Sequence, residues 1–481
     1  GNATGQTFTL TASTTGDTHI GTEKSDLFNA TTLNSLQDAD VLLDSTTTDS
    51  DILNATVTTD NVKARIQNIE TINVTGEYVK TGLALTNVSG TKTLNLDTKL
   101  AGGTATVTDA NSINAAAIKA GANISTLDIT SLTSGTRDTV TVDGGNANVT
   151  LNGVAGGADK YSVTVAKDKT LTANAMASSG DELTVNASNN FTLATGATIA
   201  TATINNTGSA AITVTATGTT DIATKLNLSG NAVTLKGDAN AFAGTDKTTA
   251  GVEVTSTATK STIELSGATT PATVFLNKAQ VSEVLVNAAI TTPVITVNEN
   301  SKLVLAKGQT TSVTADVQNA KGDLAAGKGT LLLDVNASQA KIITGANAGT
   351  VLLTAGKLAN DANGKAQTVT IAELDTNTTA TTADTIVVGG ANDLVITKLT
   401  GTADELISAT THTGKLTIND FTANTKVFSG SNDDTFKVTT GTTAVLEITS
   451  GAGNDTVDLT ASTAANKINL GAGDDTITTG A

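Results

Sequence analysis

The chain has 481 residues, and its 45 Asp and Glu against 28 Lys and Arg give a formal net charge of −17 at pH 7. This acidic balance argues against nucleic acid as a partner, because phosphate neutralisation needs clustered Lys and Arg, and it favours divalent cations. The chain contains 0 Cys, 2 Pro and only 2% aromatic residues against 38% hydrophobic residues, which excludes a disulfide scaffold and large aromatic-centred cores.

No stretch approaches 18 consecutive apolar residues, so we predict no transmembrane segment. The lack of Cys fits a protein that stays unfolded until export and needs no disulfides afterwards, although a cytosolic protein could lack Cys too. The chain opens at Gly1 without a signal-peptide pattern and closes at Ala481 directly after a repeat. We expect both ends to be cuts through a longer protein.

Residues 1–80 form an Asp-rich β segment that we expect to bind calcium. Asp44 and Asp49 lie among its carboxylates. Its candidate metal ligands are Asp17, Asp26, Asp38, Asp40 and Asp51. The apolar spacing of residues 61–70 is compatible with a helical turn, as is that of the Ala-rich residues 113–120, which Gly121 would end.

Residues 81–380 form a Thr-rich region of short alternating strings, such as TVTV at 139–142 and AITVTA at 211–216. Alternation at period two indicates half-buried strands and argues against disorder. The Gly, Asn, Asp and Ser between the strings favour tight turns. We predict an all-β fold in which two strands and two turns make one coil of about twenty residues, stacked as a parallel β-roll or β-helix, a solenoid that could comprise several subdomains. Antiparallel sandwiches remain an alternative for this region.

One candidate metal pillar lies in this region. Its carboxylates belong to Asp138, Asp159 and Asp181, which follow one another at steps of 21 and 22 residues. The turns around them lack a full glycine pattern. These residues are therefore as well explained by solvated turns as by metal sites.

Residues 381–481 carry the clearest repeat. Predicted strand centres near Val387, Ile407, Val427, Leu446 and Ile468 step by 20, 20, 19 and 22 residues. A second set, near Val395, Thr417, Lys437, Val457 and Ile477, interleaves with them. A weaker carboxylate pillar comprises Asp384, Asp393 and Asp404.

Three loops in this region, residues 429–437, 450–458 and 470–478, follow the pattern G-G-x-G-x-D-x-U-x, where U is apolar. Each has a substitution at the first Gly, and the first loop has Asn432 at the fourth position. Glycines let backbone carbonyls point inward, the sixth residue adds a carboxylate, and U anchors the next strand. Such oxygen shells suit Ca²⁺. The sixth residues lie 21 and 20 apart, so we expect the loops to stack and to share ions. The candidate ligands are Gly430, Asp433, Asp434, Gly451, Gly453, Asp455, Gly471, Gly473, Asp474 and Asp475.

Two segments resemble the lattice-forming region of bacterial surface-layer (S-layer) proteins with RTX-type repeats. At the N-terminus the likeness rests on GDT at 16–18, DLFN at 26–29, DILN at 51–54 and IQNIETINVT at 66–75. At the C-terminus it rests on residues 380–481. Lys24 and the STTT of 45–48 depart from it, standing where glycine-rich loops would be expected.

The resemblance implies one-step (type I) secretion, folding outside the cell on calcium, and assembly of copies into a two-dimensional lattice on the cell surface. It also implies that a segment outside this chain holds a cell-envelope glycolipid. The alternatives left open are a repetitive RTX adhesin and the calcium-dependent folding region of a larger secreted protein, such as a protease or lipase.

An enzymatic role is not expected from these residues. Adjacent carboxylates such as Asp433 and Asp434 should point in different directions, unlike a glycosidase pair, and aromatic residues for sugar stacking are missing. No nucleophile elbow occurs, and we expect His19 and His412 to be solvent-exposed. The repeated Thr strings could form an ice-binding face, but the ordinary preference of Thr for β-strands is the better explanation of them.

Overall fold

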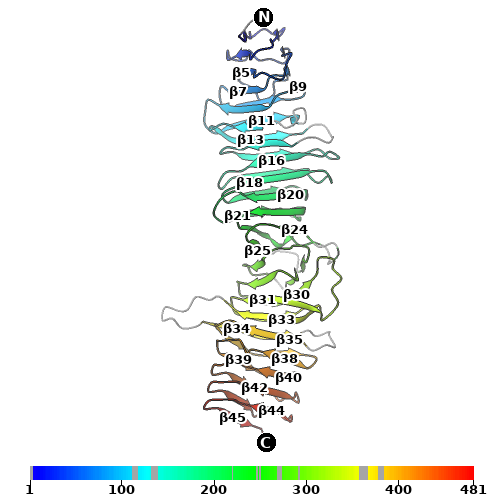
Figure 1. Cartoon of the computed structure of the whole chain (residues 1–481), viewed down its shortest axis with the longest axis vertical. Coiled ribbons are helices and arrows are strands. Elements are labelled where there is room, and N and C mark those ends of the chain that lie inside the picture. The colour runs from blue at the N-terminus through cyan, green and yellow to red at the C-terminus, as the bar shows by residue number, and fades with distance from the viewer. Residues whose placement is uncertain are drawn as a thin grey trace. The chain divides into compact units, whose positions relative to one another are not determined.

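The computed structural model describes residues 4–110, 117–131, 139–218, 220–244, 248, 251–267, 273–290, 293–356, 367–376 and 384–480. Strands make up 53% of the structure and helix 1%. The chain forms a parallel β-solenoid of about 20 turns. Figure 1 shows successive coils stacked on one another. This confirms the predicted all-β solenoid. Within the described residues the strand pairs are parallel, so the antiparallel-sandwich alternative is wrong there.

The chain divides into two compact units. Unit 1 comprises residues 1–234 and 256–260, and unit 2 comprises residues 235–255 and 261–481. The three-part division at residues 80 and 380 stays a prediction. Two strands contain the residues at which the units divide, namely β23 (Val233–Asp238) and β24 (Glu253–Ser256).

Unit 1 contains three sheets. Sheet 1A comprises, in spatial order, β1 (Thr7–Thr9), β3 (Leu27–Ala30), β5 (Ile52–Val57), β7 (Thr71–Gly76), β10 (Thr93–Thr98), β12 (Ala117–Ala120), β14 (Val140–Asp143), β16 (Lys160–Thr164), β18 (Glu182–Ala187), β20 (Ile199–Asn206) and β22 (Ala223–Gly230). Sheet 1B comprises β2 (Thr18–Ile20), β4 (Val41–Leu43), β6 (Arg65–Gln67) and β9 (Val88–Ser89). Sheet 1C comprises β8 (Lys80–Ala84), β11 (Gly103–Thr108), β13 (Ile124–Thr130), β15 (Asn148–Asn152), β17 (Thr170–Asn174), β19 (Phe191–Thr195) and β21 (Ile212–Thr217).

Unit 2 contains two long sheets. Sheet 2A comprises β25 (Ser261–Gly267), β27 (Glu283–Val286), β29 (Lys302–Leu305), β31 (Gly329–Val335), β33 (Ala348–Ala355), β35 (Thr385–Gly389), β38 (Glu405–Ser408), β40 (Thr425–Phe428), β42 (Leu446–Thr449) and β44 (Lys467–Asn469). Sheet 2B comprises β26 (Thr273–Leu276), β28 (Val294–Asn298), β30 (Ser312–Gln318), β32 (Gln339–Thr344), β34 (Thr368–Thr376), β36 (Asp393–Ile396), β39 (Leu416–Asn419), β41 (Thr435–Lys437), β43 (Thr456–Leu459) and β45 (Thr476–Thr479), and β37 (Leu399–Gly401) also pairs with β34.

Consecutive coils place like residues on like residues. The Asn73 amide donates to Asn54 Oδ1 at 2.8 Å, and the Asn95 amide donates to Asn73 Oδ1 at 2.7 Å. These partners lie 19 and 22 residues apart, close to the predicted coil length. A longer step occurs in unit 2, where Thr350 pairs with Thr385 across 35 residues. Coil length therefore varies while the parallel register is kept.

The core of unit 2 consists of apolar columns that run from coil to coil. Ile418, Phe436, Val457 and Ile477 pair in register through β39, β41, β43 and β45. Their alternation with outward Thr and Lys residues is the sequence pattern that predicted these strands. The apolar residue of the first two C-terminal loops, Phe436 and Val457, thus anchors its strand in the core as expected, whereas Ile477 of the third loop is 45% exposed.

Replacing Phe436 with alanine is expected to destabilise unit 2. Phe436 is 0% exposed, and deleting a buried Phe side chain costs about 3–5 kcal/mol. Urea denaturation of the full chain, followed by circular dichroism, measures the change. The half-buried neighbour Thr435 is the control, and Thr435→Ala should cost less than about 1 kcal/mol. Equal effects of the two substitutions would contradict the core assignment.

Neither expected helical turn is found among the residues that the structure describes. Residues 61–70 contain the strand β6, in which Ile66 pairs with Leu42 and with Val88. Residues 117–120 form β12, while 113–116 lie outside the described residues. Coil-to-coil pairing outweighs the weak local helical pattern. The 3₁₀ turn η2 comprises residues Ala239–Ala241.

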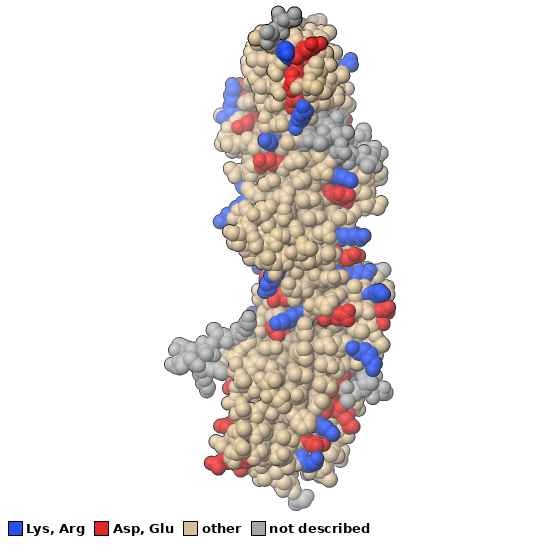
Figure 2. All heavy atoms as spheres, in the orientation of Figure 1, with Lys and Arg blue, Asp and Glu red and all other residues tan. Residues whose placement is uncertain are grey.

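Within the described part of the chain, no helix combines the length and apolarity that crossing a membrane requires. On the face seen in Figure 2, acidic and basic side chains are interspersed between broad uncharged areas. Cross-coil ion pairs account for some of this pattern. Glu447, for example, lies within 3.4 Å of Lys426 and 3.1 Å of Lys467 in the two flanking coils.

Candidate metal centre

The C-terminal loops stack as their spacing predicted. The backbone N–H of Asp434 donates to Asp455 Oδ1 at 2.8 Å, and that of Asp455 donates to Asp475 Oδ1 at 2.9 Å. Each sixth-position carboxylate therefore ties its own coil to the preceding coil. The partners are 21 and 20 residues apart, so the three loops form one ladder.

Glycine is required where these loops approach one another. Gly451, Gly453, Gly471 and Gly473 all have positive φ, between 89° and 143°. A Cβ on Gly471 would lie 1.8 Å from Gly451 O, and one on Gly473 would lie 1.8 Å from Gly453 O. Gly430 belongs to the same stack, where Ala452 N donates to its carbonyl at 3.1 Å. The glycine pattern thus permits close stacking of loop on loop.

The carboxylates of this ladder are largely engaged within the protein. Asp434 accepts hydrogen bonds from Leu416 N and from the Ser429 hydroxyl, and burial raises the pKa of Asp434. Asp455 is buried, and its Oδ2 has no hydrogen-bond partner. Asp433 and Asp474 are exposed. In the ladder, Asp455 is therefore the buried carboxylate with a free oxygen.

The pillar upstream of this ladder is built from a different pair than the sequence suggested. Glu405, not Asp404, meets Asp384, because the Asp384 N–H donates to Glu405 Oε2 at 3.2 Å. Asp404 is exposed, and Asp393 is half-buried and accepts from Lys415 N. Burial raises the pKa of Asp384, and burial together with the negative charge of Asp384 raises the pKa of Glu405 to about 7.

In the middle of unit 1, Asp159 and Asp181 are joined by the same kind of hydrogen bond, from a backbone N–H in one coil to a carboxylate in the next. The Asp159 N–H donates to Asp181 Oδ1 at 2.8 Å, and Ser178 N donates to Asp181 Oδ2 at 2.8 Å. Both oxygens of Asp181 thus accept backbone N–H groups, and the pair closes turns. The third member of this predicted pillar, Asp138, lies outside the described residues.

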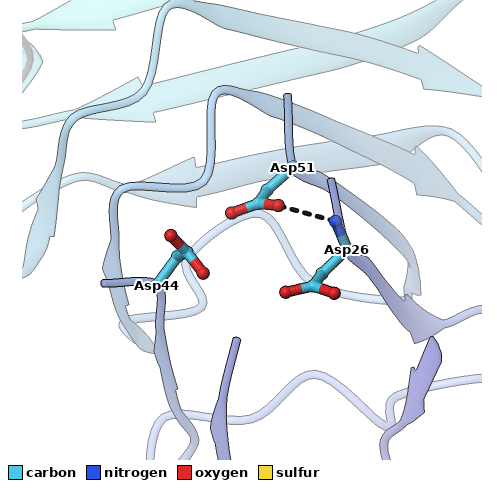
Figure 3. Close-up of side chains that lie close together, drawn as sticks. All are labelled: Asp26, Asp44 and Asp51. Atoms are coloured by element: carbon cyan, nitrogen blue, oxygen red, sulfur yellow. Dashed lines mark hydrogen bonds between the residues drawn. The ribbon is translucent and has the colours of Figure 1, made fainter. Parts of the chain in front are cut away.

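The N-terminal carboxylates converge most closely. Asp26, Asp44 and Asp51 bring ligand oxygens within 4.8 Å of one another, and Figure 3 shows the three side chains around one space. Asp49, Asp51 and Glu70 form a second such group, which shares Asp51. We call these five residues the acidic cluster and the two groups its inner and outer lobes. Among the described residues, no other group of three carboxylates or imidazoles meets this distance.

The parallel register explains this convergence. Leu27 pairs with Ile52, and Ile52 pairs with Thr71, so the residues just before β3, β5 and β7 lie in one column. Those residues are Asp26, Asp51 and Glu70. Asp26 N donates to Asp51 Oδ1 at 2.7 Å, and Asp51 N donates to Glu70 Oε2 at 2.9 Å. Asp44 comes next to this column because it directly follows β4, and its oxygens lie within 4.8 Å of those of Asp26 and Asp51.

Four members of the acidic cluster are buried, Asp49 is half-buried, and the cluster is incompletely hydrogen-bonded. The exposed fractions are 2% for Asp26, 4% for Asp44, 0% for Asp51 and 5% for Glu70. Four buried oxygens lack a hydrogen-bond partner: Asp44 Oδ1, Asp49 Oδ2, Asp51 Oδ2 and Glu70 Oε1. Buried charges are ordinarily paired or bound to metals. Unpartnered carboxylate oxygens at this density are the donor set that a hard divalent cation needs.

Electrostatics support the same interpretation. Burial, with the negative charges of Asp44, Asp49 and Glu70, raises the pKa of Asp51 to about 7. Gly21 leaves room beside the inner lobe, because a Cβ there would lie 2.3 Å from Asp44 Oδ1 and 2.8 Å from Asp26 Oδ2. The residues therefore fit a Ca²⁺ ion in charge, ligand type and space.

The other N-terminal candidates serve turns. Asp17 N donates to Asp40 Oδ1, and Gln37 N donates to Asp40 Oδ2, both at 2.7 Å. Asp17 in turn accepts from Thr11, and the exposed Asp38 accepts from Lys63 N. These carboxylates lie outside the acidic cluster.

Sequence reasoning missed Glu70, which it assigned to a helical turn. A signal was present, because 26–29, 51–54 and 70–73 read DLFN, DILN and ETIN. Each is an acid, one intervening residue, an apolar residue and Asn, and the three stack in register. Aligning these strings would have placed Glu70 in the column.

The prediction of exposed histidines is wrong for His412, which is 2% exposed. Its Nδ1 lies 3.2 Å from the Gly389 carbonyl oxygen, because the turn at 409–412 folds back onto the neighbouring coil. His19 is half-buried, with its ring centroid 5.3 Å from that of Phe8.

Comparisons with known proteins leave the interpretation to this geometry. No family model matches the chain, and no curated protein matches it. The features of the chain that indicate a function are the acidic cluster, the stacked C-terminal loops and the solenoid that holds them.

Proposed function

We propose that this protein is a structural component of a bacterial surface layer, secreted and assembled with copies of itself into a two-dimensional lattice once calcium has folded it. The acidic cluster carries the calcium part of this proposal, because its buried oxygens lack partners. The lattice part is supported by the resemblance of residues 16–75 and 380–481 to RTX-type S-layer proteins and by the solenoid fold.

Asp26, Asp44 and Asp51 would hold the ion in the inner lobe of unit 1. Calcium supplies the positive charge that neutralises carboxylates kept apart from solvent. Without it, Asp44, Asp49, Asp51 and Glu70 repel one another in a buried space. Asp455 and the stacked glycine loops offer a second place, in unit 2, where backbone carbonyls would complete the ligand shell.

This arrangement couples ion binding to folding. The column of Asp26, Asp51 and Glu70 exists only when β3, β5 and β7 are stacked, so the unfolded chain presents no such site. Binding free energy then becomes folding free energy. In a cytosol poor in free Ca²⁺ the chain stays suited to export, and the medium outside the cell drives its folding.

Circular dichroism of the full chain with calcium and with a chelator tests the first part. We expect chelation to lower the midpoint of thermal unfolding, by several degrees for each kcal/mol of linked binding energy. Addition of Mg²⁺ at the same concentration is the control, because Mg²⁺ binds all-protein oxygen cages reluctantly. An unchanged melting curve after chelation would refute calcium-dependent folding.

Electron microscopy of the purified protein after addition of Ca²⁺ tests the second part. Ordered two-dimensional arrays are expected, and they should dissolve on chelation. Monomers that persist in calcium would contradict the lattice and favour a stiff adhesin or a calcium-dependent folding region of a larger secreted protein.

A further inference from the structure

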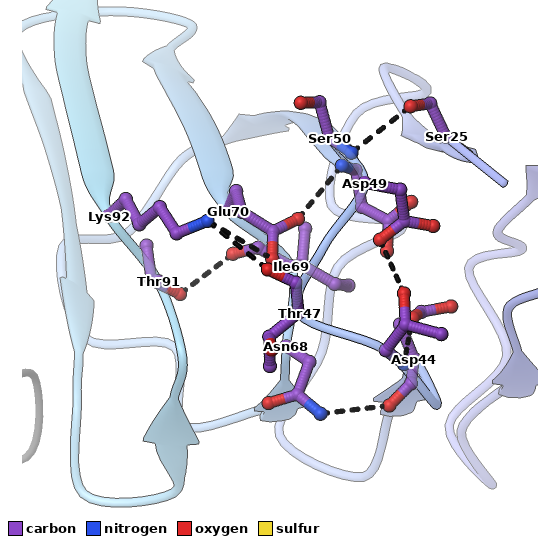
Figure 4. Close-up of polar contacts among 12 residues, drawn as sticks. Ser25, Asp44, Thr47, Asp49, Ser50, Asn68, Ile69, Glu70, Thr91 and Lys92 are labelled. Carbon is purple, nitrogen blue, oxygen red and sulfur yellow. Dashed lines mark hydrogen bonds and ion pairs between the residues drawn. The ribbon is translucent and has the colours of Figure 1, made fainter. Parts of the chain in front are cut away.

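The two lobes of the acidic cluster differ in whether a basic side chain lies beside them. Lys92 begins the coil after Glu70, and both Lys92 N and Thr93 N donate to the Glu70 carbonyl at 2.9 Å. The Lys92 ammonium lies 3.9 Å from Glu70 Oε1 and donates to the Thr47 carbonyl at 3.4 Å. Figure 4 shows this side chain extended toward Glu70 at the outer lobe.

No ion pair between described residues brings a Lys or Arg to Asp26, Asp44 or Asp51. The inner lobe thus has three carboxylates and no protein counter-charge. The outer lobe, comprising Asp49, Asp51 and Glu70, has one. In the outer lobe, Asp49 Oδ2 and Glu70 Oε1 are buried and lack a hydrogen-bond partner. The same holds for Asp44 Oδ1 and Asp51 Oδ2 in the inner lobe.

We propose that the outer lobe is a second calcium subsite that Lys92 keeps closed, so that the wild-type cluster binds a single ion, in the inner lobe. This proposal rests on the calcium binding proposed above and adds the residue that sets its stoichiometry. The ammonium supplies the positive charge near Glu70 that a second divalent ion would otherwise bring. Two divalent ions sharing Asp51 would also repel each other across one carboxylate.

The lysine side chain can be removed without disturbing the core. Its side chain is 63% exposed, whereas that of Glu70 is 6% exposed. Lys92→Met keeps the length and the apolar stem and deletes the charge. Lys99→Met is the matched control, because Lys99 is similarly exposed and forms an ion pair with Glu77 outside the cluster, at 2.5 Å.

Native mass spectrometry of the full chain in CaCl₂, with circular dichroism to confirm folding, counts the bound ions. We expect Lys92→Met to hold one more calcium ion than the wild type, and Lys99→Met to hold the same number as the wild type. Adding Asp49→Asn to Lys92→Met should remove the extra ion. In the wild-type background, Asp44→Asn should lose one ion and Asp49→Asn should lose none.

Equal counts in Lys92→Met and the wild type, with an ion lost in Asp44→Asn, would overturn the role of Lys92 alone. Loss of an ion in Asp49→Asn on the wild-type background would also overturn it, since the outer lobe would then be open. An unchanged count in Asp44→Asn would instead refute calcium binding by the cluster, and with it this inference.

Discussion

Replacing Asp51 with asparagine is expected to stabilise the calcium-free protein and to destabilise the calcium-loaded protein. Asp51 is 0% exposed, and burial raises its pKa to about 7, so its charge opposes folding when no ion is present. The asparagine Oδ1 can still accept the Asp26 N–H, which Asp51 Oδ1 accepts at 2.7 Å. Removing the charge should therefore add about 2–4 kcal/mol to the free energy of unfolding in chelator at pH 8.

In saturating calcium the sign reverses. Asp51 belongs to both lobes, so its loss removes a ligand that no neighbour replaces. Ligand-linked stabilisation is about 4 kcal/mol at a thousandfold excess over the dissociation constant, and each tenfold loss of affinity removes about 1.4 kcal/mol. Urea denaturation of the full chain with and without calcium measures both effects.

Asp181 is the matched control, because it is equally buried and both of its oxygens accept backbone N–H groups. Asp181→Asn puts a donor where one acceptor stood, so it should cost about 1–3 kcal/mol in calcium and in chelator alike. If Asp51→Asn behaved as Asp181→Asn does, Asp51 would be a turn residue and the cluster would not bind a cation.

Lowering the pH should stabilise the calcium-free protein, contrary to the usual behaviour of acidic side chains. Burial raises the pKa of Asp51 from 3.8 to about 7 and that of Glu405 from 4.5 to about 7. Between about pH 4 and pH 7 the folded protein therefore holds protons that the unfolded chain has released. Stability falls as pH rises through this window, by up to about 1.4 kcal/mol per pH unit for each group.

Several carboxylates act in the opposite sense, at lower pH. Hydrogen bonds from Lys467 and Lys426 lower the pKa of Glu447, and hydrogen bonds from Thr460 lower that of Asp458. Their contributions are lost only as pH falls below about 4.5, the usual range of free carboxyl groups. Stability of the calcium-free protein should thus peak near pH 4–5.

Urea denaturation in chelator at pH 5, 6, 7 and 8 measures this dependence. In calcium the trend should reverse between pH 7 and 5, because protons compete with the ion for the same oxygens. Glu405→Gln removes one of the two groups whose pKa is raised to about 7, and it should flatten the profile in chelator without changing the calcium count of the acidic cluster. Stability in chelator that rises with pH would contradict the raised pKa values.

The coil and its period follow from local features of the chain. Strings such as TINV and TLNL alternate at period two, which predicts the side chains that are buried. Because a solenoid stacks each strand on a similar strand of the next coil, the sequence repeat also predicts which strands pair. The stacking of Asp434, Asp455 and Asp475 was likewise predictable, because 20- and 21-residue steps match one coil.

The acidic cluster depended on tertiary structure. Asp26 and Glu70 meet Asp51 only because β3, β5 and β7 pair in register across coils of unequal length, which the spacing of carboxylates does not show. The same variation displaced the expected partner of Asp384 from Asp404 to Glu405. Period-two alternation is a property of each strand by itself. Which carboxylates come into contact depends instead on the number of residues between one strand and its partner in the next coil. In the folded coils, one oxygen each of Asp44, Asp49, Asp51 and Glu70 is buried without a hydrogen-bond partner. This burial is a property of the tertiary structure, because in the unfolded chain water would hydrogen-bond these oxygens.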